Sequence, residues 1–131
     1  MDYMLMPWRR YADFSGRSRR KEFWAHTVLV VLAEIVLFGW IMAASAAADG
    51  RMTTSVAIPF VLLLILGLAV LIPTLAVTIR RLHDQDKSGW LCLVALVPIL
   101  GAAVLLAFMC LQGTAGPNRY GPDPRSGAFR S

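Results

Sequence analysis

Three long apolar stretches dominate the chain, and polar segments separate them. We expect membrane spans over 23–48, 56–79 and 90–111, because each stretch is long enough for a helix that crosses about 30 Å of hydrocarbon. The apolar positions run on without helical or alternating periodicity, as is typical of helices surrounded by lipid. The pattern predicts a single all-α integral membrane domain, 1–131, with three transmembrane helices.

Residues 1–22 precede the first span and are expected to form an interfacial leader with a short amphipathic helix. Aromatic side chains lie on one side of this helix and charged side chains on the other: Trp8, Tyr11 and Phe14 against Arg9, Arg10 and Asp13. Pro7 suits the first helical position and Gly16 suits the end. Such a helix would turn its aromatic side toward the acyl chains. A leader without fixed structure is the alternative, because so short a helix is marginal in water.

The segments after the first span are expected to be less regular. Pro73 lies inside the second span and should kink the helix or leave a carbonyl group free near that level. The polar residues 80–89 are expected to form a loop. The tail, 112–131, contains four Gly and three Pro residues and is expected to be irregular.

Charge indicates the orientation and the kind of partner. Only 16% of the 131 residues are charged, against about a quarter in soluble domains, and the net charge is +5. The basic residues flank apolar spans, which favours anionic phospholipid over nucleic acid as a partner. The positive-inside tendency predicts a cytoplasmic N-terminus and a cytoplasmic 80–89 loop. With three spans the tail would lie outside, whereas a re-entrant break at 98–101 would return it to the cytoplasm.

Three motifs carry a resemblance to a known family. They are Tyr-Ala-Asp-Phe-Ser-Gly-Arg-Ser-Arg-Arg-Lys-Glu-Phe-Trp at 11–24, Arg-Arg-Leu-His-Asp at 80–84 followed by Ser-Gly-Trp at 88–90, and the Gly/Pro-rich segment 113–124. In this order they resemble the small bacterial membrane proteins catalogued as domain of unknown function 805. The resemblance implies a bacterial inner-membrane protein with a few helices. It implies no activity, catalytic residue or cofactor.

Basic residues from two segments should share one face, because two spans separate the segments. These candidates for contact with anionic lipid or another anionic ligand are Arg17, Arg19, Arg20, Lys21, Arg80 and Arg81. Several of them stand at the start of a helix, where the dipole disfavours cations unless an anion lies nearby. Simple topological anchoring by these charges is the alternative.

Two carboxylates and two imidazoles should lie near the same face, as a polar cluster of Glu22, His26, His83 and Asp84. These side chains could ligate a metal or haem, or could form ion pairs with the neighbouring arginines. Because the spacing matches no ligand signature, we expect no metal and no cofactor.

Glu34 is expected about 15 Å into the first span, near the bilayer midplane. A carboxylate at that depth is costly and is a functional candidate. It could line a polar pathway, meet another subunit or hydrogen-bond a neighbouring backbone group.

The motifs of common enzyme classes are absent from the sequence. We therefore expect a non-catalytic accessory or assembly subunit that contacts anionic lipid, other membrane proteins or further copies of itself. The alternatives are a small oligomeric transporter or channel that uses Glu34, and a membrane-embedded enzyme that modifies lipid.

Overall fold

The computed structural model describes residues 2–126, and within this range every regular element is a helix. The elements are α1 (Asp2–Arg9), α2 (Arg20–Ala47), α3 (Thr54–Asp84), the 3₁₀ helix η1 (Gly89–Leu96) and α4 (Leu100–Cys110). In the described range the chain forms no strand beyond one isolated bridge between Asn118 and Gly121. The all-α class is confirmed.

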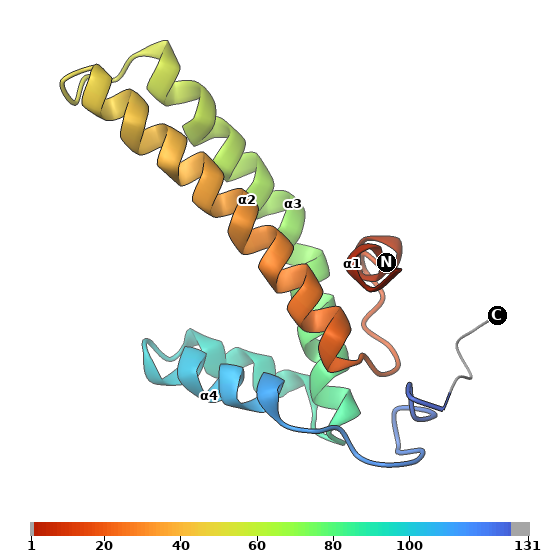
Figure 1. Ribbon diagram of the computed structural model, residues 1–131. Coiled ribbons are helices and arrows are strands. Elements are labelled where there is room, and N and C mark those ends of the chain that lie inside the picture. The colour runs from red at the N-terminus through yellow and green to blue at the C-terminus, as the bar shows by residue number, and fades with distance from the viewer. Residues whose placement is uncertain (1, 127–131) are drawn as a thin grey trace.

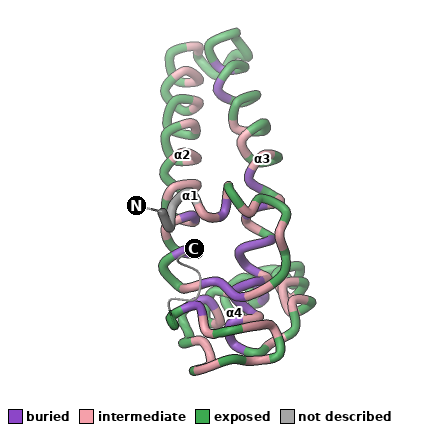
Figure 2. Tube along the Cα trace, turned by 90° about the vertical axis from the view of Figure 1, so that its right-hand side faces the viewer, coloured by how far each residue is buried: buried purple, intermediate pink, exposed green. Residues whose placement is uncertain are grey.

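Helices α2 and α3 form a long antiparallel pair (Figure 1). With 28 and 31 residues they measure about 42 and 46 Å, and both are long and apolar enough to cross a membrane. Most of their side chains are exposed along the outer half of the pair, as expected where lipid surrounds a helix (Figure 2). Helix α3 continues to Asp84, so the first half of the predicted 80–89 loop is helical.

The expected third span, 90–111, is not a single helix. Helix η1 ends at Leu96, the backbone of Ile99 has a φ of +66°, and α4 begins at Leu100. Pro98 causes this break, because proline has no N–H group and disfavours helical backbone at the preceding residue. Each half is about 16 Å long, too short to cross the bilayer alone. The prediction of a third transmembrane helix is therefore not confirmed.

The two halves fold back on each other as the η1–α4 hairpin, residues 89–110 (Figure 1). Gly101 makes this close return possible, because a Cβ atom at that position would lie 1.8 Å from the carbonyl O of Val94. The hairpin stands apart from the α2–α3 pair along most of its length. Only its base joins the small apolar core formed by Phe23, Val77, Leu82 and Met109.

The leader is less helical than expected. Helix α1 ends at Arg9 instead of continuing to Gly16, and Pro7 lies inside it instead of at its first position. Figure 1 shows α1 end-on, so it lies across the α2–α3 pair. Trp8 packs edge-on against His26 of α2, with 5.9 Å between ring centroids. The leader is therefore docked on the two long helices.

Buried residues gather where α2 begins and α3 ends, and this region is called the polar end below (Figure 2). The leader and residues 112–126 of the tail pack there together. Of the two predicted positions of the tail, the structure shows the one beside the leader, because the side chain of Arg17 hydrogen-bonds the carbonyl groups of Thr114 and Gly116. The chain reverses at Pro98, which brings the tail back. Residues 127–131 of the predicted tail lie outside the described residues.

Candidate functional site: a buried ionic centre at the polar end

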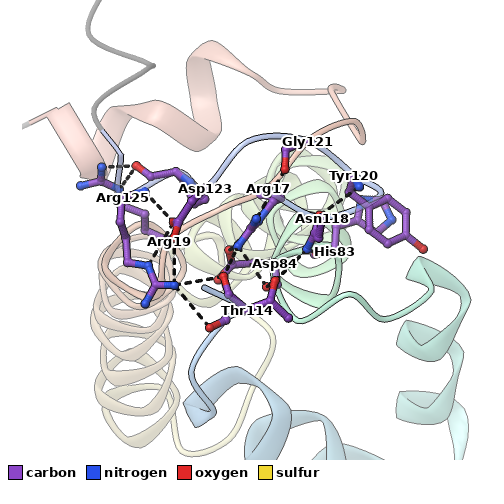
Figure 3. A network of polar contacts seen from close by, with 12 residues as sticks. Arg17, Arg19, His83, Asp84, Thr114, Asn118, Tyr120, Gly121, Asp123 and Arg125 are labelled. Atoms are coloured by element: carbon purple, nitrogen blue, oxygen red, sulfur yellow. Dashed lines mark hydrogen bonds and ion pairs between the residues drawn. The ribbon is translucent and has the colours of Figure 1, made fainter. Parts of the chain in front are cut away.

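Asp84, the last residue of α3, receives two guanidinium groups, and Figure 3 shows that of Arg17. Its Oδ1 atom accepts a hydrogen bond of 2.9 Å from Nε of Arg17, and its Oδ2 atom accepts one of 2.5 Å from Nη1 of Arg81. The side chains of both arginines are fully buried, and that of Asp84 is 7% exposed. The buried carboxylate is thus compensated by charge and by hydrogen bonds, as burial of an ion requires.

Arg17 also binds the tail. Its Nη1 and Nη2 atoms donate bonds of 2.6 Å to the carbonyl oxygens of Gly116 and Thr114, while the Thr114 N–H donates to the backbone O of Asp84. The tail comes so close that a Cβ atom on Gly113 would lie 1.8 Å from Oδ2 of Asp84. One arginine therefore links the leader, the end of α3 and the tail.

A second buried ion pair joins the two long helices. Nη2 of Arg80 donates to Oε1 of Glu22 across 3.0 Å, and the backbone O of Arg80 accepts from the N–H of Ser18. Glu22 stands in the first turn of α2, where a negative charge is favoured by the helix dipole. Nε and Nη1 of Arg80 have no hydrogen-bond partner among the described residues.

The two histidines occupy different surroundings. Nε2 of His26 lies 2.9 Å from Oγ1 of Thr74. His83 stacks on Tyr120, with 3.8 Å between ring centroids and planes 6° apart, and its Nδ1 atom lies 3.2 Å from the carbonyl O of Gly16. The predicted cluster of two histidines and two carboxylates is therefore divided among separate partners. Within residues 2–126, no group of three or more His, Cys, Asp or Glu could hold a metal ion.

The basic residues predicted to contact lipid fall into two groups. Arg17, Arg80 and Arg81 are buried in the ion pairs just described, so their guanidinium groups cannot reach lipid, in contrast with the expectation. The other three, Arg19, Arg20 and Lys21, line a cavity of about 280 Å³ together with Arg125, Asp84 and Gly113. This space is called the basic cavity below.

The tail closes one side of the basic cavity. Nε of Arg19 donates to the carbonyl O of Pro124 across 2.6 Å, and Arg125 forms an ion pair of 3.0 Å with Asp123. The hydrogen bond from Arg125 lowers the pKa of Asp123, so this carboxylate stays ionised. Arg20 and Lys21 remain exposed at the mouth of the cavity.

Glu34 stands near the middle of α2 and is half-buried. It makes no hydrogen bond or ion pair with any residue in 2–126. The alternative in which Glu34 hydrogen-bonds a neighbouring backbone group is therefore not seen.

The sequence analysis did not identify the tail residues as members of the site. Asn118 donates to the backbone O of His83 across 2.9 Å, and Tyr120 covers the imidazole of the same residue. The signal for these contacts was present, because both residues belong to the 113–124 motif. All three motifs meet at the polar end.

Comparison with known proteins identifies the family of the chain. A family model described as "Protein of unknown function (DUF805)" matches residues 11–122, the range that contains the three motifs. The inner membrane protein YhaI of Escherichia coli is 41% identical over 128 residues, covering 98% of this chain and 99% of the relative. The inner membrane protein YhaH is 37% identical and covers 95% and 98% of the two chains.

A more distant relative, the uncharacterized protein YiiR of Escherichia coli, is 28% identical over 144 residues and covers 91% of this chain. No solved structure matches. The family model and the two inner membrane proteins cover nearly the whole chain. The chain therefore belongs to the DUF805 family of proteins of unknown function.

Proposed function

We propose that the protein is a non-catalytic accessory protein of the bacterial inner membrane that binds anionic phospholipid at its polar end. Two apolar helices of sufficient length and relatives named as inner membrane proteins support the location. The lipid headgroup would enter the basic cavity, where its phosphate would meet Arg20 and Lys21.

The composition and position of the basic cavity carry this proposal. Lys21 makes no hydrogen bond with a described residue, and Arg20 makes one bond of 3.2 Å, from Nη1 to the carbonyl O of Cys110. Both residues stand in the first turn of α2, whose N-cap, Arg19, makes no side-chain capping bond. Free N–H groups and the helix dipole favour an anion at this point, and the cations add to the attraction.

The charge distribution supports a cytoplasmic polar end. Eleven of the twelve Lys and Arg residues in 2–126 belong to this end, in the segments 9–21, 80–87 and 119–125, whereas Arg51 lies in the turn at the opposite end. The tail adds Arg119 and Arg125 to this end, because it packs beside the leader. Such a bias is typical of cytoplasmic loops, and that leaflet carries anionic lipid.

The acidic and imidazole side chains at the polar end already interact with other residues of the protein, which supports a non-catalytic role. Asp84 and Glu22 are held in buried ion pairs, while His26 and His83 are held by Thr74 and by Tyr120. A general acid or base must reach a substrate. These groups instead hold the leader, the helix ends and the tail together.

Retention of lipid by the full chain tests the proposal. The protein, extracted in mild detergent and supplied with equal amounts of phosphatidylglycerol and phosphatidylcholine, should retain phosphatidylglycerol in native mass spectrometry. Replacing Arg20 and Lys21 together by Gln should weaken retention roughly thirty-fold, because each basic residue near an anionic headgroup contributes about 1 kcal/mol. Added salt should weaken retention by the wild type.

Arg51→Gln is the matched control, because it removes an exposed cation from the opposite end and should leave retention unchanged. Equal retention of the two lipids by the wild type, or equal loss in the control and the double variant, would overturn the proposal.

Glu34 supports a second candidate, a small transporter or channel built by self-association. Its carboxyl group is half-buried at membrane depth without a partner among residues 2–126, so a residue of another copy could supply one. In this case, the mass of the detergent-extracted protein should be that of a homo-oligomer, and Glu34→Gln should reduce it to a monomer. A wild-type monomer would exclude this candidate.

A further inference from the structure

The η1–α4 hairpin is an apolar surface that the described chain leaves uncovered. From Trp90 to Leu111 the sequence contains no charged, amide or hydroxyl side chain. At the tip, Leu96, Ile99 and Leu100 are 77%, 87% and 70% exposed. Soluble proteins rarely leave so large a contiguous apolar surface in water, so another apolar phase must cover it.

We propose that this hairpin inserts into the leaflet that adjoins the polar end and turns back inside it without crossing the bilayer. Its two halves, of 8 and 11 residues, are each about 16 Å long, which is half the thickness of the hydrocarbon core. The turn at 97–99 would therefore lie no deeper than about the midplane, whatever the tilt of the hairpin.

Both ends of the hairpin are held at the polar end, so entry and exit occur on one side. At the start, the Ser88 hydroxyl accepts from the N–H of Trp90, and Gly89 packs against Ile79. At the end, Arg81 and Gln85 donate to the carbonyl oxygens of Leu111 and Phe108. Arg81 lies in the last turn of α3 and Gln85 is the C-cap of this helix, so both donors stand at the polar end.

The backbone of the turn is suited to hydrocarbon. Irregular backbone is costly in lipid, because each N–H group without an acceptor costs several kcal/mol. Here the N–H groups of Val97, Leu100 and Gly101 donate to Val94, Pro98 and Val97 at 3.0, 2.7 and 3.0 Å. Pro98 has no N–H group to satisfy. Among residues 97–101, only the N–H group of Ile99 therefore lacks an acceptor within the described chain.

The distribution of exposed side chains favours lipid over a protein partner. Leu93 and Val97 are exposed on the first half and its turn, and Val104 and Leu106 on the second half. A partner helix would cover one face of the hairpin. Exposure on both halves instead suits lipid, which surrounds the hairpin on all sides. This inference does not depend on lipid headgroups binding in the basic cavity.

Labelling of single cysteines tests the inference in the full chain, in membranes of cells that express it. Cys92 and Cys110 are replaced by Ala, and one cysteine is introduced at Ala12, Met52, Ile99 or Ala115, all of which are exposed residues. A membrane-impermeant maleimide is then added to vesicles of either orientation. Ala12→Cys and Ala115→Cys should react from one side and Met52→Cys from the other, whereas Ile99→Cys should react from neither.

Each other outcome contradicts the inference in a distinct way. Reaction of Ala115→Cys from the same side as Met52→Cys would mean that 90–111 crosses the membrane. Ready reaction of Ile99→Cys from the side of Ala12 would place the hairpin in water. Efficient oxidative cross-linking between two Ile99→Cys chains would mean that a second copy covers the tip. None of these results depends on which lipid the protein retains.

Discussion

The hydroxyl group of Tyr11 donates a hydrogen bond of 2.7 Å to the carbonyl O of Ala69, four residues before Pro73. In an α-helix the N–H group of residue 73 would donate to that carbonyl, but proline has none. The sequence predicted that Pro73 would kink α3 or free a carbonyl near its level. The structure shows that the leader supplies the replacement donor, which fixes its docking point on α3.

Tyr11→Phe should destabilise the protein by about 1 kcal/mol, the typical net contribution of one hydrogen bond. The loss should shrink when Pro73 is replaced by Ala, because the restored N–H group then occupies the carbonyl of Ala69. Unfolding in detergent of the wild type, both single variants and the double variant measures this coupling. Strict additivity of the two substitutions would show that Tyr11 and Pro73 act independently.

Asp84→Asn should be among the most damaging single substitutions, at about 3–5 kcal/mol, because it leaves two buried guanidinium groups without their counter-charge. Asp86→Asn is the matched control. Its ion pair with Arg119 is exposed, with side chains 45% and 59% accessible, and such pairs contribute about 0–1 kcal/mol. The comparison is made by the same unfolding experiment, and similar losses for both variants would refute the assigned role of Asp84.

Gly113→Ala should release the tail from the polar end, since the added methyl group would overlap the Asp84 carboxylate. Trypsin should then cleave after Arg119 at least about ten times faster, which corresponds to a loss of about 1.4 kcal/mol in tail docking. Gly39→Ala is the control. A Cβ atom at Gly39 meets nothing within 4 Å, so tail cleavage should keep its wild-type rate.

Asp13 predicts a pH dependence in the leader. A hydrogen bond from the Ser15 hydroxyl, together with Arg10, lowers the pKa of Asp13 from 3.8 to about 2. Because the folded-state pKa is lowered, this stabilisation is present above pH 3.8 and is lost as the pH falls toward 2. Carboxyl NMR titration should give a midpoint near 2, and Ser15→Ala should raise it. A midpoint that Ser15→Ala leaves unchanged would argue against this hydrogen bond.

The local pattern of the sequence was sufficient to predict the two long helices. Continuous apolar runs predicted α2 and α3. Because two predicted spans separate Glu22 from Arg80 and Asp84, the sequence also predicted that these residues would gather at one end. The same reasoning treated the basic residues as a lipid-facing surface. It could not show that Arg17, Arg80 and Arg81 are buried, because that burial depends on which segments cover them.

The remaining features depend on one break in the chain. Continuous hydrophobicity over 90–111 predicts a span, and Pro98 and Gly101 allowed a break at 98–101 only as an alternative. The backbone at Pro98 and Ile99 does reverse the direction of the chain. That reversal decides where the tail lies. Contacts such as Tyr120 on His83 join residues far apart in the chain and follow from the reversal, so no periodicity near either residue encodes them.

Arg17 also imposes an order on biosynthesis. The arginine and Asp84 are both made before the residues whose carbonyl groups complete the guanidinium shell, since Thr114 and Gly116 leave the ribosome after both of them. Until then a buried cation lacks two of its acceptors. The α2–α3 pair can insert early, but the polar end cannot close before Gly116 has left the ribosome. A chain that stops before residue 112 would retain this defect permanently.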